Sequence, residues 1–241
     1  PDTEDPIVTA PAGITLDCGA ISGTTDPSAT VSNWLASATA TDNCDTDPTL
    51  TYNFDATTLN VCVGGTLTVT WTATDACGNT ATATSTITVV PDTEAPAMTC
   101  PAPATAQCSV DEIPVYDNLA EFNTAGGTAS DNCGLNTGLF GLLSQTQNGN
   151  VYTRTYRVTD NCGNTTTCTQ TITVLDTEIP TFVNCPANIT VGNDVDKCGA
   201  NVVFSTPIAE DNCQIVTVTQ TAGLASGSLF PVGTTTVIFT A

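Results

Sequence analysis

The sequence predicts an all-β chain in which tandem β-sandwich domains form a linear array. Threonine alternates with mostly apolar residues at a period of two in segments such as residues 66–74, a pattern typical of half-buried strands. The segment Asp-Thr-Glu-x-Pro occurs at Asp2, Asp92 and Asp176, which are spaced by 90 and 84 residues. Units of this size built from short alternating strands match an immunoglobulin-like β-sandwich.

The recurring segment serves as a linker, because it follows threonine-rich predicted strands such as residues 84–90 and 169–175. It divides the chain into repeat 1, residues 1–90, repeat 2, residues 91–175, and repeat 3, residues 176–241. Repeat 3 stops where repeat 2 still has a turn and a last strand. We therefore expect one strand to be missing. Either the chain is a fragment of a longer array, or a neighbour supplies the strand by donor-strand complementation.

Short helical turns are predicted at residues 33–36 and 118–122, and the rest of the chain is predicted to form strands and turns. Trp34 and Trp71 are expected in the core, and Trp71 occupies the place of Tyr156 in repeat 2. Arg154 and Arg157 lie three residues apart in one predicted strand. They should therefore face opposite sides and form no basic patch.

The composition excludes several classes of function. The chain has 24 acidic and three basic residues, a formal net charge of -21 and no histidine, which removes histidine-dependent catalysis and imidazole zinc sites. The negative charge also argues against binding to nucleic acids and anionic membranes, because both attract basic proteins. No apolar run approaches the roughly 20 residues of a membrane helix. A glycosidase would use paired carboxylates. The acidic residues here lie in hydrophilic turns, however, and only 5% of residues are aromatic, so we expect no enzyme.

The chain has twelve cysteines and no C-x-x-C pair, which favours disulfides formed in an oxidising compartment and hence an exported protein. In every repeat a cysteine before the second strand accompanies an Asp-Asn-Cys triplet. This joint occurrence favours three pairs within repeats: Cys18–Cys44, Cys108–Cys133 and Cys198–Cys213. Cys100 and Cys168 are both replaced by alanine in repeat 1, which suggests that they pair, and Cys185 would then await a partner in the missing strand.

The remaining cysteines leave the connectivity open. Cys62 and Cys77 pair by elimination under the scheme above. A rival scheme joins the turns directly, with the pairs Cys44–Cys77, Cys133–Cys162 and Cys18–Cys62. Repeat 2 has five cysteines, so at least one lacks a partner inside its own repeat, either Cys162 or Cys108. A buried, inert thiol is the default interpretation of that residue.

Oxygen-bearing side chains should gather at one pole of each sandwich. In a seven-stranded sandwich the first strand begins at the pole where the second strand joins the third and the sixth joins the seventh. The candidate ligands at these poles are Asp2, Glu4, Asp42, Asp75 and Asn79 in repeat 1, Asp92, Glu94, Asp131, Asp160 and Asn164 in repeat 2, and Asp176, Glu178 and Asp211 in repeat 3.

Calcium is the cofactor that this set of residues predicts. It takes 6 to 8 oxygen ligands in flexible geometry, and the chain has few lysines or arginines to neutralise the carboxylates. The competing interpretation is structural, because aspartate and asparagine commonly cap their own turns. Under that interpretation solvent and bulk sodium screen the carboxylates.

Repeat 3 resembles the hyalin repeat, or HYR domain, in its Cys-Pro-Ala-Asn-Ile-Thr-Val segment at residues 185–191 and its Phe-Pro-Val-Gly-Thr-Thr-Thr-Val segment at residues 230–237. Repeats 1 and 2 resemble the repeats of large cell-surface adhesins of Bacteroidetes, including those of gliding cells. The resemblance rests on motifs such as Tyr-Arg-Val-Thr-Asp-Asn-Cys-Gly-Asn at residues 156–164. It implies an immunoglobulin-like extracellular adhesion module on the cell surface.

Two functional classes remain open. The first is the stalk or filament of a surface adhesin, stiffened by disulfides and calcium, whose partners are neighbouring repeats of the same long chain. The second is a binding module that recognises a glycan or another cell-surface protein directly. Similar repeats favour the stalk, because a dedicated binding domain should depart from its neighbours.

Overall fold

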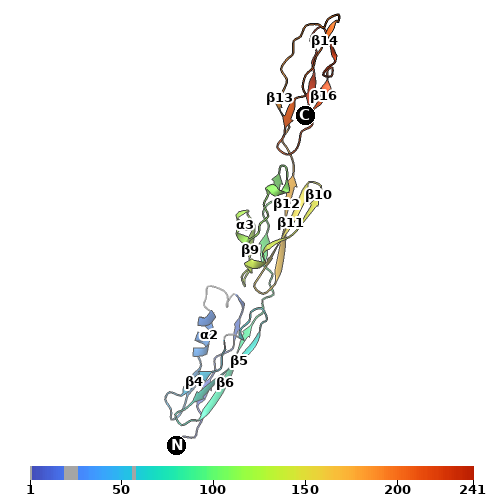
Figure 1. Cartoon of the computed structure of the whole chain (residues 1–241). Coiled ribbons are helices and arrows are strands. Elements are labelled where there is room, and N and C mark those ends of the chain that lie inside the picture. The colour runs from blue at the N-terminus through green and yellow to red at the C-terminus, as the bar shows by residue number, and fades with distance from the viewer. Residues whose placement is uncertain (1, 19–26, 56–57) are drawn as a thin grey trace. The chain divides into compact units, whose positions relative to one another are not determined.

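The computed structural model describes residues 2–18, 27–55 and 58–241, and the fold of this part of the chain is all-β (Figure 1). It contains two compact units. The first comprises Pro1–Ala102, Val115–Gln145 and Arg154–Gln170, and the second comprises Pro103–Pro114, Thr146–Thr153 and Thr171–Ala241. Repeat 1 lies in the first unit, repeat 3 lies in the second, and repeat 2 contributes residues to both. No helix among the described residues is long and apolar enough to cross a membrane.

Repeat 1 contains a two-stranded and a four-stranded sheet. Strand β1 (Ile7–Thr9) pairs antiparallel with β3 (Thr39–Thr41). The larger sheet has the order β2-β6-β5-β4, from β2 (Ile14–Leu16), β6 (Thr80–Val89), β5 (Gly65–Thr74) and β4 (Thr49–Tyr52). Strand β2 runs parallel to β6, and the other pairs are antiparallel. In β5 the apolar residues Val69, Trp71 and Ala73 are fully buried between threonines, which confirms the predicted alternation.

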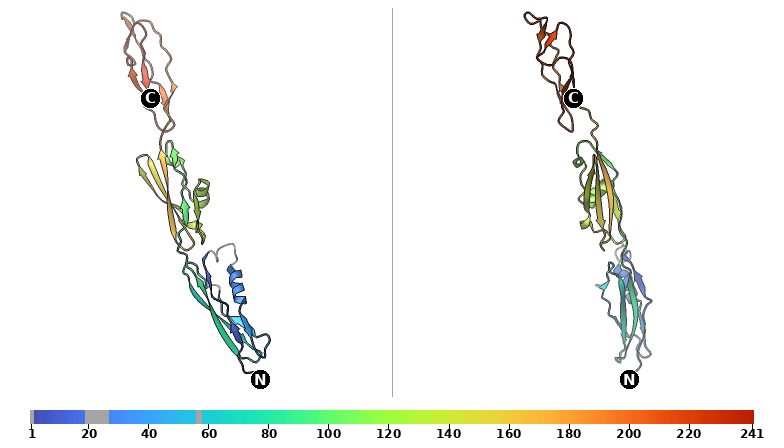
Figure 2. Two further views of the ribbon diagram at one scale, coloured as in Figure 1. Left: turned by 180° about the vertical axis from the view of Figure 1, so that it is seen from behind. Right: turned by 90° about the vertical axis from the view of Figure 1, so that its right-hand side faces the viewer.

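Helix α2 (Pro27–Ala36) packs on the buried face of this sheet and lies beside its strands in the left view of Figure 2. The rings of Trp34 and Trp71 meet edge to face at a centroid distance of 5.0 Å. The indole Nε1 of Trp71 donates to the Leu35 carbonyl at 3.2 Å, so the polar atom of a buried side chain is satisfied. Both tryptophans are core residues, as predicted. The helix is ten residues long, whereas the sequence predicted a single turn at residues 33–36.

Repeat 2 follows the same plan. Strand β7 (Ala97–Thr99) pairs with β9 (Thr128–Ser130), and a second sheet has the order β10-β11-β12-β8. Its strands are β10 (Gly141–Asn148), β11 (Val151–Thr159), β12 (Thr165–Val174) and β8 (Ala104–Ala106). The parallel pair β8–β12 corresponds to the pair β2–β6 of repeat 1. Two 3-10 helices, η2 (Val110–Glu112) and η3 (Thr137–Leu139), lie in the connections.

The predicted turn at residues 118–122 is helix α3 (Leu119–Thr124), where the side chain of Asn118 accepts from the Glu121 N–H. Phe122 and Tyr156 are fully buried, and their rings pack at 5.7 Å. Gly127 is required beside this cluster, because a Cβ there would lie 2.3 Å from the Phe122 ring. Arg154 is buried and Arg157 is exposed, which confirms that they face opposite sides.

Repeat 3 consists of three antiparallel pairs. These are β13 (Thr181–Asn184) with β15 (Ile208–Glu210), β14 (Gly199–Asn201) with β17 (Leu229–Pro231), and β16 (Thr219–Ala222) with β18 (Ile238–Thr240). Strand β14 pairs antiparallel with β17, whereas β2 and β8 each pair in parallel with a later, longer strand. A cavity of about 850 Å³ opens here, and apolar residues such as Phe182, Ile189 and Phe230 line it.

Candidate functional site: acidic poles and cross-repeat disulfides

Three acidic clusters form where sequence-distant turns meet. Pole 1 comprises Asp2, Asp42 and Asp75, pole 2 comprises Asp92, Asp131 and Asp160, and pole 3 comprises Asp176, Asp211 and Cys213. One ligand atom from each member lies within 4.8 Å of the others in the same pole. Each pole therefore combines a linker carboxylate with an Asp-Asn-Cys turn, as the sandwich topology predicted. Poles 1 and 2 add the aspartate that directly follows strand β5 or β11, which are the strands before the last one of each repeat.

The third aspartate of poles 1 and 2 is held by an asparagine four residues later. Asp75 accepts from the backbone N–H and the side-chain Nδ2 of Asn79, both at 2.7 Å. Asp160 accepts from the same groups of Asn164 at 2.9 and 2.8 Å. Asn79 and Asn164 thus position the aspartates through their donor groups. The structural interpretation of these turns as self-capping is correct for Asp75 and Asp160.

These hydrogen bonds favour the ionised form of Asp75 and Asp160. Burial raises the pKa of Asp160, but hydrogen bonds from the side chain and backbone of Asn164 outweigh it and leave the pKa below the ordinary 3.8. The pKa of Asp75 is lowered by the same balance of burial and Asn79. The backbone N–H groups of Asp45 and Cys44 lower the pKa of Asp42. Asp42, Asp75 and Asp160 are therefore ionised at neutral pH.

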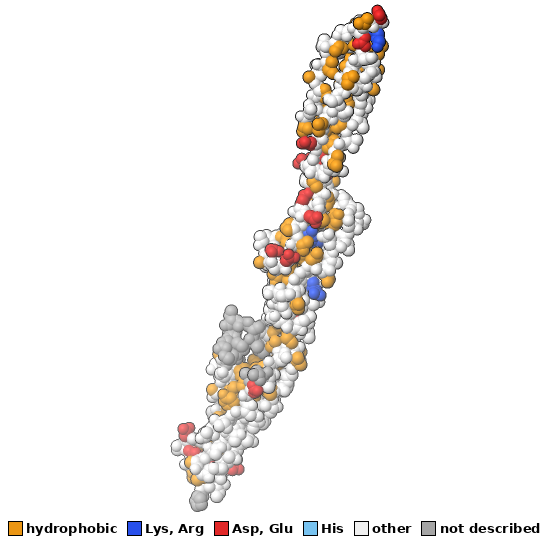
Figure 3. Space-filling model, viewed as in Figure 1, with side chains coloured by type: hydrophobic (Ala, Val, Ile, Leu, Met, Phe, Trp, Pro, Cys, Tyr) orange, Lys and Arg blue, Asp and Glu red, His pale blue; other side chains and the backbone are white. Residues whose placement is uncertain are grey.

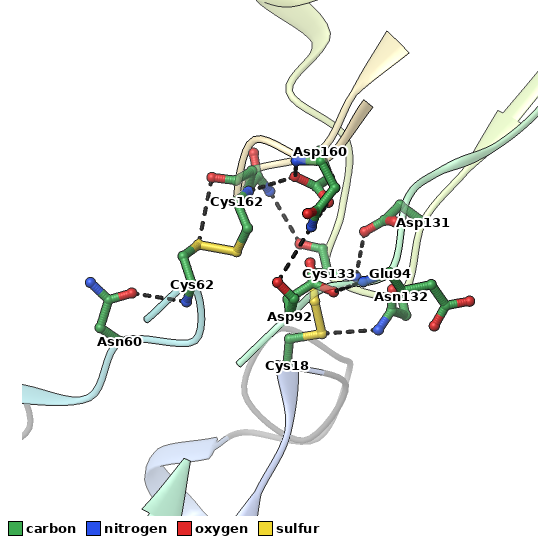
Figure 4. The surroundings of a disulfide bond; sticks show 12 residues. Cys18, Asn60, Cys62, Asp92, Glu94, Asp131, Asn132, Cys133, Asp160 and Cys162 are labelled. Atoms are coloured by element: carbon green, nitrogen blue, oxygen red, sulfur yellow. Dashed lines mark hydrogen bonds between the residues drawn. A yellow bond between two sulfur atoms is a disulfide. The ribbon is translucent and has the colours of Figure 1, made fainter. Parts of the chain in front are cut away.

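Two buried carboxylate oxygens of pole 2 have no hydrogen-bond partner among the residues that the structure describes (Figure 4). They are Oδ2 of Asp92 and Oδ2 of Asp131. Asp92 is only 8% exposed, and its other oxygen accepts from the Glu94 N–H at 3.2 Å. A buried, unpaired carboxylate oxygen is costly unless a cation or a donor compensates it.

The predicted glutamates take different positions from the aspartates. Glu4, Glu94 and Glu178 follow the linker aspartates and lie outside the three clusters. Glu4 accepts from the Asn43 side chain at 2.5 Å, and the Glu178 N–H donates to Asp176 at 3.1 Å. Figure 3 shows acidic side chains in small groups separated by uncharged surface.

The disulfides join neighbouring repeats. Cys18–Cys133 and Cys62–Cys162 connect repeat 1 to repeat 2, with Cα separations of 5.2 and 4.9 Å. Cys108–Cys213 connects repeat 2 to repeat 3 with a Cα separation of 4.9 Å. Only Cys100–Cys168 closes within one repeat among the described residues, and it is the pair that the joint replacement by alanine suggested.

The other predicted pairings are wrong. Neither the preferred pairs Cys18–Cys44, Cys108–Cys133, Cys198–Cys213 and Cys62–Cys77, nor the rival pairs Cys44–Cys77, Cys133–Cys162 and Cys18–Cys62, occur in the structure. The earlier of the two recurring cysteines bonds to the following repeat in Cys18 and Cys108, and the later one bonds to the preceding repeat in Cys133 and Cys213. Cys162 is likewise a bonded residue, not an inert thiol. The odd number of cysteines in repeat 2 was the signal for a bond that leaves the repeat.

Pole 2 lies between the two disulfides that join repeats 1 and 2. The triplet of Asp131 provides Cys133, and the turn of Asp160 provides Cys162. The Asp92 N–H donates to the Val61 carbonyl of repeat 1 at 2.8 Å, and the Asn164 side chain donates to the Asp92 carbonyl at 3.4 Å. The linker is therefore hydrogen-bonded on both sides of the junction, contacts that the sequence did not predict.

The junction of repeats 2 and 3 is built similarly. The Leu175 N–H donates to the Ala106 carbonyl at 2.9 Å, and the side chains of Gln107 and Thr177 hydrogen-bond at 3.2 Å. Cys108 follows Gln107 directly and bonds to Cys213, which is a member of pole 3. Four cysteines keep free, exposed thiols: Cys44, Cys77, Cys185 and Cys198.

Comparisons with known proteins identify one family model and two curated relatives. Residues 175–241 match the HYR domain family model. Hyalin of Strongylocentrotus purpuratus is 35% identical over 179 residues, which cover 70% of this chain and 14% of that protein. Hyalin of Lytechinus variegatus is 34% identical over 254 residues, which cover 99% of this chain and 44% of that protein. The chain thus spans less than half of either relative.

Solved structures with a similar fold include the extracellular domain of protocadherin GammaB4. It is 16% identical, with a TM-score of 0.33, over 94% of this chain and 43% of that one. Cadherin domains 1–4 of protocadherin Gamma B7 match with 14% identity and a TM-score of 0.26, over 80% of this chain and 64% of that one. No argument rests on a likeness at this level.

Proposed function

We propose that the chain is a stalk segment of an extracellular, adhesion-type repeat protein on the cell surface. The observation that carries this proposal is the covalent connection across both repeat junctions, formed by Cys18–Cys133, Cys62–Cys162 and Cys108–Cys213. A stalk must transmit tension from one repeat to the next. Disulfides across the junctions carry that tension even when a sandwich unfolds, and they persist in an oxidising compartment.

Similarity to hyalin, together with the HYR match of repeat 3, supports the placement in an array of such repeats. The proposal extends to a filament of a gliding-type adhesin only through the sequence resemblance. The partners of the segment are then the neighbouring repeats of its own long chain.

The test is immunolabelling of the cells that produce the protein, with antibodies raised against this chain. The proposal predicts labelling of intact, unpermeabilised cells, and loss of label after surface proteolysis. Label that appears only after permeabilisation would contradict it. Binding of the isolated chain to a glycan array would instead favour direct recognition of a ligand.

We further propose that the poles bind calcium as a structural ion. At pole 2 the unpartnered oxygens of Asp92 and Asp131 lie close to a carboxylate oxygen of Asp160. The ion pair found among the described residues, Lys197–Asp194, lies outside this pole. Calcium binds carboxylate and carbonyl oxygens in flexible geometry, and it would compensate the unpartnered carboxylate oxygens of this cluster. The ion would add a non-covalent clamp to the two disulfides.

Isothermal titration calorimetry of Asp92→Asn tests this site. Asparagine keeps the Oδ1 that accepts from Glu94 but lacks the charge, so the variant should fold and lose one of the calcium sites of the wild-type chain. Asp117→Asn is the matched control, because Asp117 is exposed and lies outside the poles, and its titration should equal that of the wild type. No calcium heat in the wild-type chain would reduce the poles to self-capped turns.

A further inference from the structure

Two free cysteines lie in the turns that form pole 1, and two bonded cysteines lie in the equivalent turns that form pole 2. Cys44 ends an Asp-Asn-Cys triplet, as Cys133 does, and Cys77 lies in the same later turn as Cys162. The Cys44 N–H donates to Asp42 at 2.9 Å, and the Cys133 N–H donates to Asp131 at 2.7 Å. The local conformation of the triplet is therefore the same in both repeats.

The later turn repeats this agreement. The N–H groups of Cys77 and Cys162 donate to Asp75 and Asp160 at 2.9 and 2.8 Å. The linker is held alike as well, since Asn79 donates to the Asp2 carbonyl and Asn164 donates to the Asp92 carbonyl, both at 3.4 Å. Pole 1 thus has the receiving half of a junction already formed.

What differs is the state of the sulfur atoms. At pole 2, Cys133 and Cys162 are bonded to Cys18 and Cys62 of the preceding repeat, and not to each other. At pole 1, Cys44 and Cys77 are free and exposed. The two turns that form disulfides at pole 2 therefore carry unpaired thiols at pole 1. A surface that presents two cysteines placed like Cys18 and Cys62 would pair with them.

We propose that pole 1 is a docking surface for a further repeat of the repeat 1 type, which it binds through two disulfides. The Cys18-type cysteine of that repeat bonds to Cys44, and its Cys62-type cysteine bonds to Cys77. Residues 1–4 and 91–94 share the sequence Pro-Asp-Thr-Glu, so a repeat that ends as residues 84–90 do can enter pole 1 through the same linker. The inference rests on the proposed function as an array of repeats.

Each bond joins two thiols, which together lose two protons and two electrons. A disulfide oxidant, such as oxidised glutathione or an exported thiol oxidase that carries a disulfide, accepts the electrons and is reduced to two thiols. Two disulfides at one junction also fix the rotation of the incoming repeat, because a single disulfide would leave that rotation free. In repeat 3 the free Cys198 has the sequence position of Cys18 and Cys108, the cysteines that bond to a following repeat.

The test places a second copy of residues 1–90 directly before residue 1 of the full chain. The added copy carries Cys44→Ser and Cys77→Ser, so that its only cysteines are Cys18 and Cys62. After refolding in a glutathione redox buffer, free thiols should fall from the four of the parent chain to two, Cys185 and Cys198. Peptide mapping should then recover Cys44 and Cys77 bonded to the added Cys18 and Cys62.

A control tandem with Cys18→Ser and Cys62→Ser also in the added copy should keep Cys44 and Cys77 free. Six free thiols in the first tandem, or four if the added Cys18 and Cys62 bond to each other, would overturn the inference. A bond between Cys44 and Cys77 would overturn it as well. The native bonds Cys18–Cys133 and Cys62–Cys162 report in the same sample that the chain has folded. Their absence would contradict the proposed stalk instead, so the two failures are distinguishable.

A second measurement uses the parent chain alone. Under the same redox buffer, a thiol-reactive maleimide should label both Cys44 and Cys77, since neither has its partner. If the maleimide labels neither thiol until a reductant is added, Cys44 and Cys77 bond to each other in the parent chain. Pole 1 would then be closed to docking.

Discussion

The maximum length of the unfolded chain under tension depends on which cysteines are paired. Consider the chain held at its two ends and pulled until every sandwich is unfolded, with all disulfides intact. The shortest covalent path runs to Cys18, crosses to Cys133, returns along the chain to Cys108, crosses to Cys213 and continues to the C-terminus. That path contains about 70 residues, so at about 3.5 Å per residue the taut molecule measures about 25 nm.

Other states of the cysteines give different lengths. The fully reduced chain of 241 residues should reach about 85 nm. Disulfides confined to single repeats would leave a path of roughly 40 to 45 nm. Replacing Cys108 and Cys213 by serine removes the second crossing, and the oxidised variant should lengthen from about 25 to about 43 nm.

Single-molecule force spectroscopy measures these contour lengths directly. Pulling in a calcium chelator leaves only covalent restraints, and adding a reductant to the same molecules provides the 85 nm reference. The variant Cys198→Ser is the matched control, because it removes a free thiol and should leave the oxidised length unchanged. An oxidised wild-type length of 40 nm or more would refute the cross-repeat pairing.

Further predictions concern stability and pH. Replacing Cys100 and Cys168 by alanine opens a loop of 68 residues and should lower the free energy of unfolding of repeat 2 by about 4 kcal/mol in chemical denaturation, whereas Cys198→Ser should change it little. The pKa of Asp75 and Asp160 is below 3.8 in the folded chain, so their stabilisation is complete above the unfolded pKa and is lost as the pH falls through the folded value. Urea unfolding in chelator should therefore show a drop in stability below about pH 4 that is smaller in Asp160→Asn, and an equal drop in that variant would contradict the assignment.

The sandwich and the poles could be predicted because both follow from local pattern and topology. The alternation around Trp71 sets which face is buried, and Tyr156 repeats it in the next domain. The same topology brings Asp92, Asp131 and Asp160 together, although they are far apart in sequence. The length of helix α2 could not be predicted, because the sequence indicates only a single turn. Its apolar residues Val31, Trp34 and Leu35 have helical spacing, but serines and threonines between them weaken the signal.

The disulfide pairing could not be predicted for a physical reason. When each repeat contributes one cysteine to the junction before it and one to the junction after it, the two always occur together. Joint occurrence of Cys18 and Cys44 is therefore the same whether they bond to each other or to neighbours. Only the arrangement of the repeats in space, with Cys18 beside Cys133, distinguishes the two cases.

The most direct test of the cross-repeat connection is non-reducing peptide mapping of the native chain. Trypsin is unsuitable because the chain has three basic residues, but cleavage before aspartate separates Cys18, Cys44, Cys62 and Cys133 onto different peptides. The account predicts that peptides with Cys18 and Cys133 are recovered joined, and that the Cys62 peptide is joined to the one with Cys162. Recovery of Cys18 joined to Cys44 or to Cys62 would contradict it.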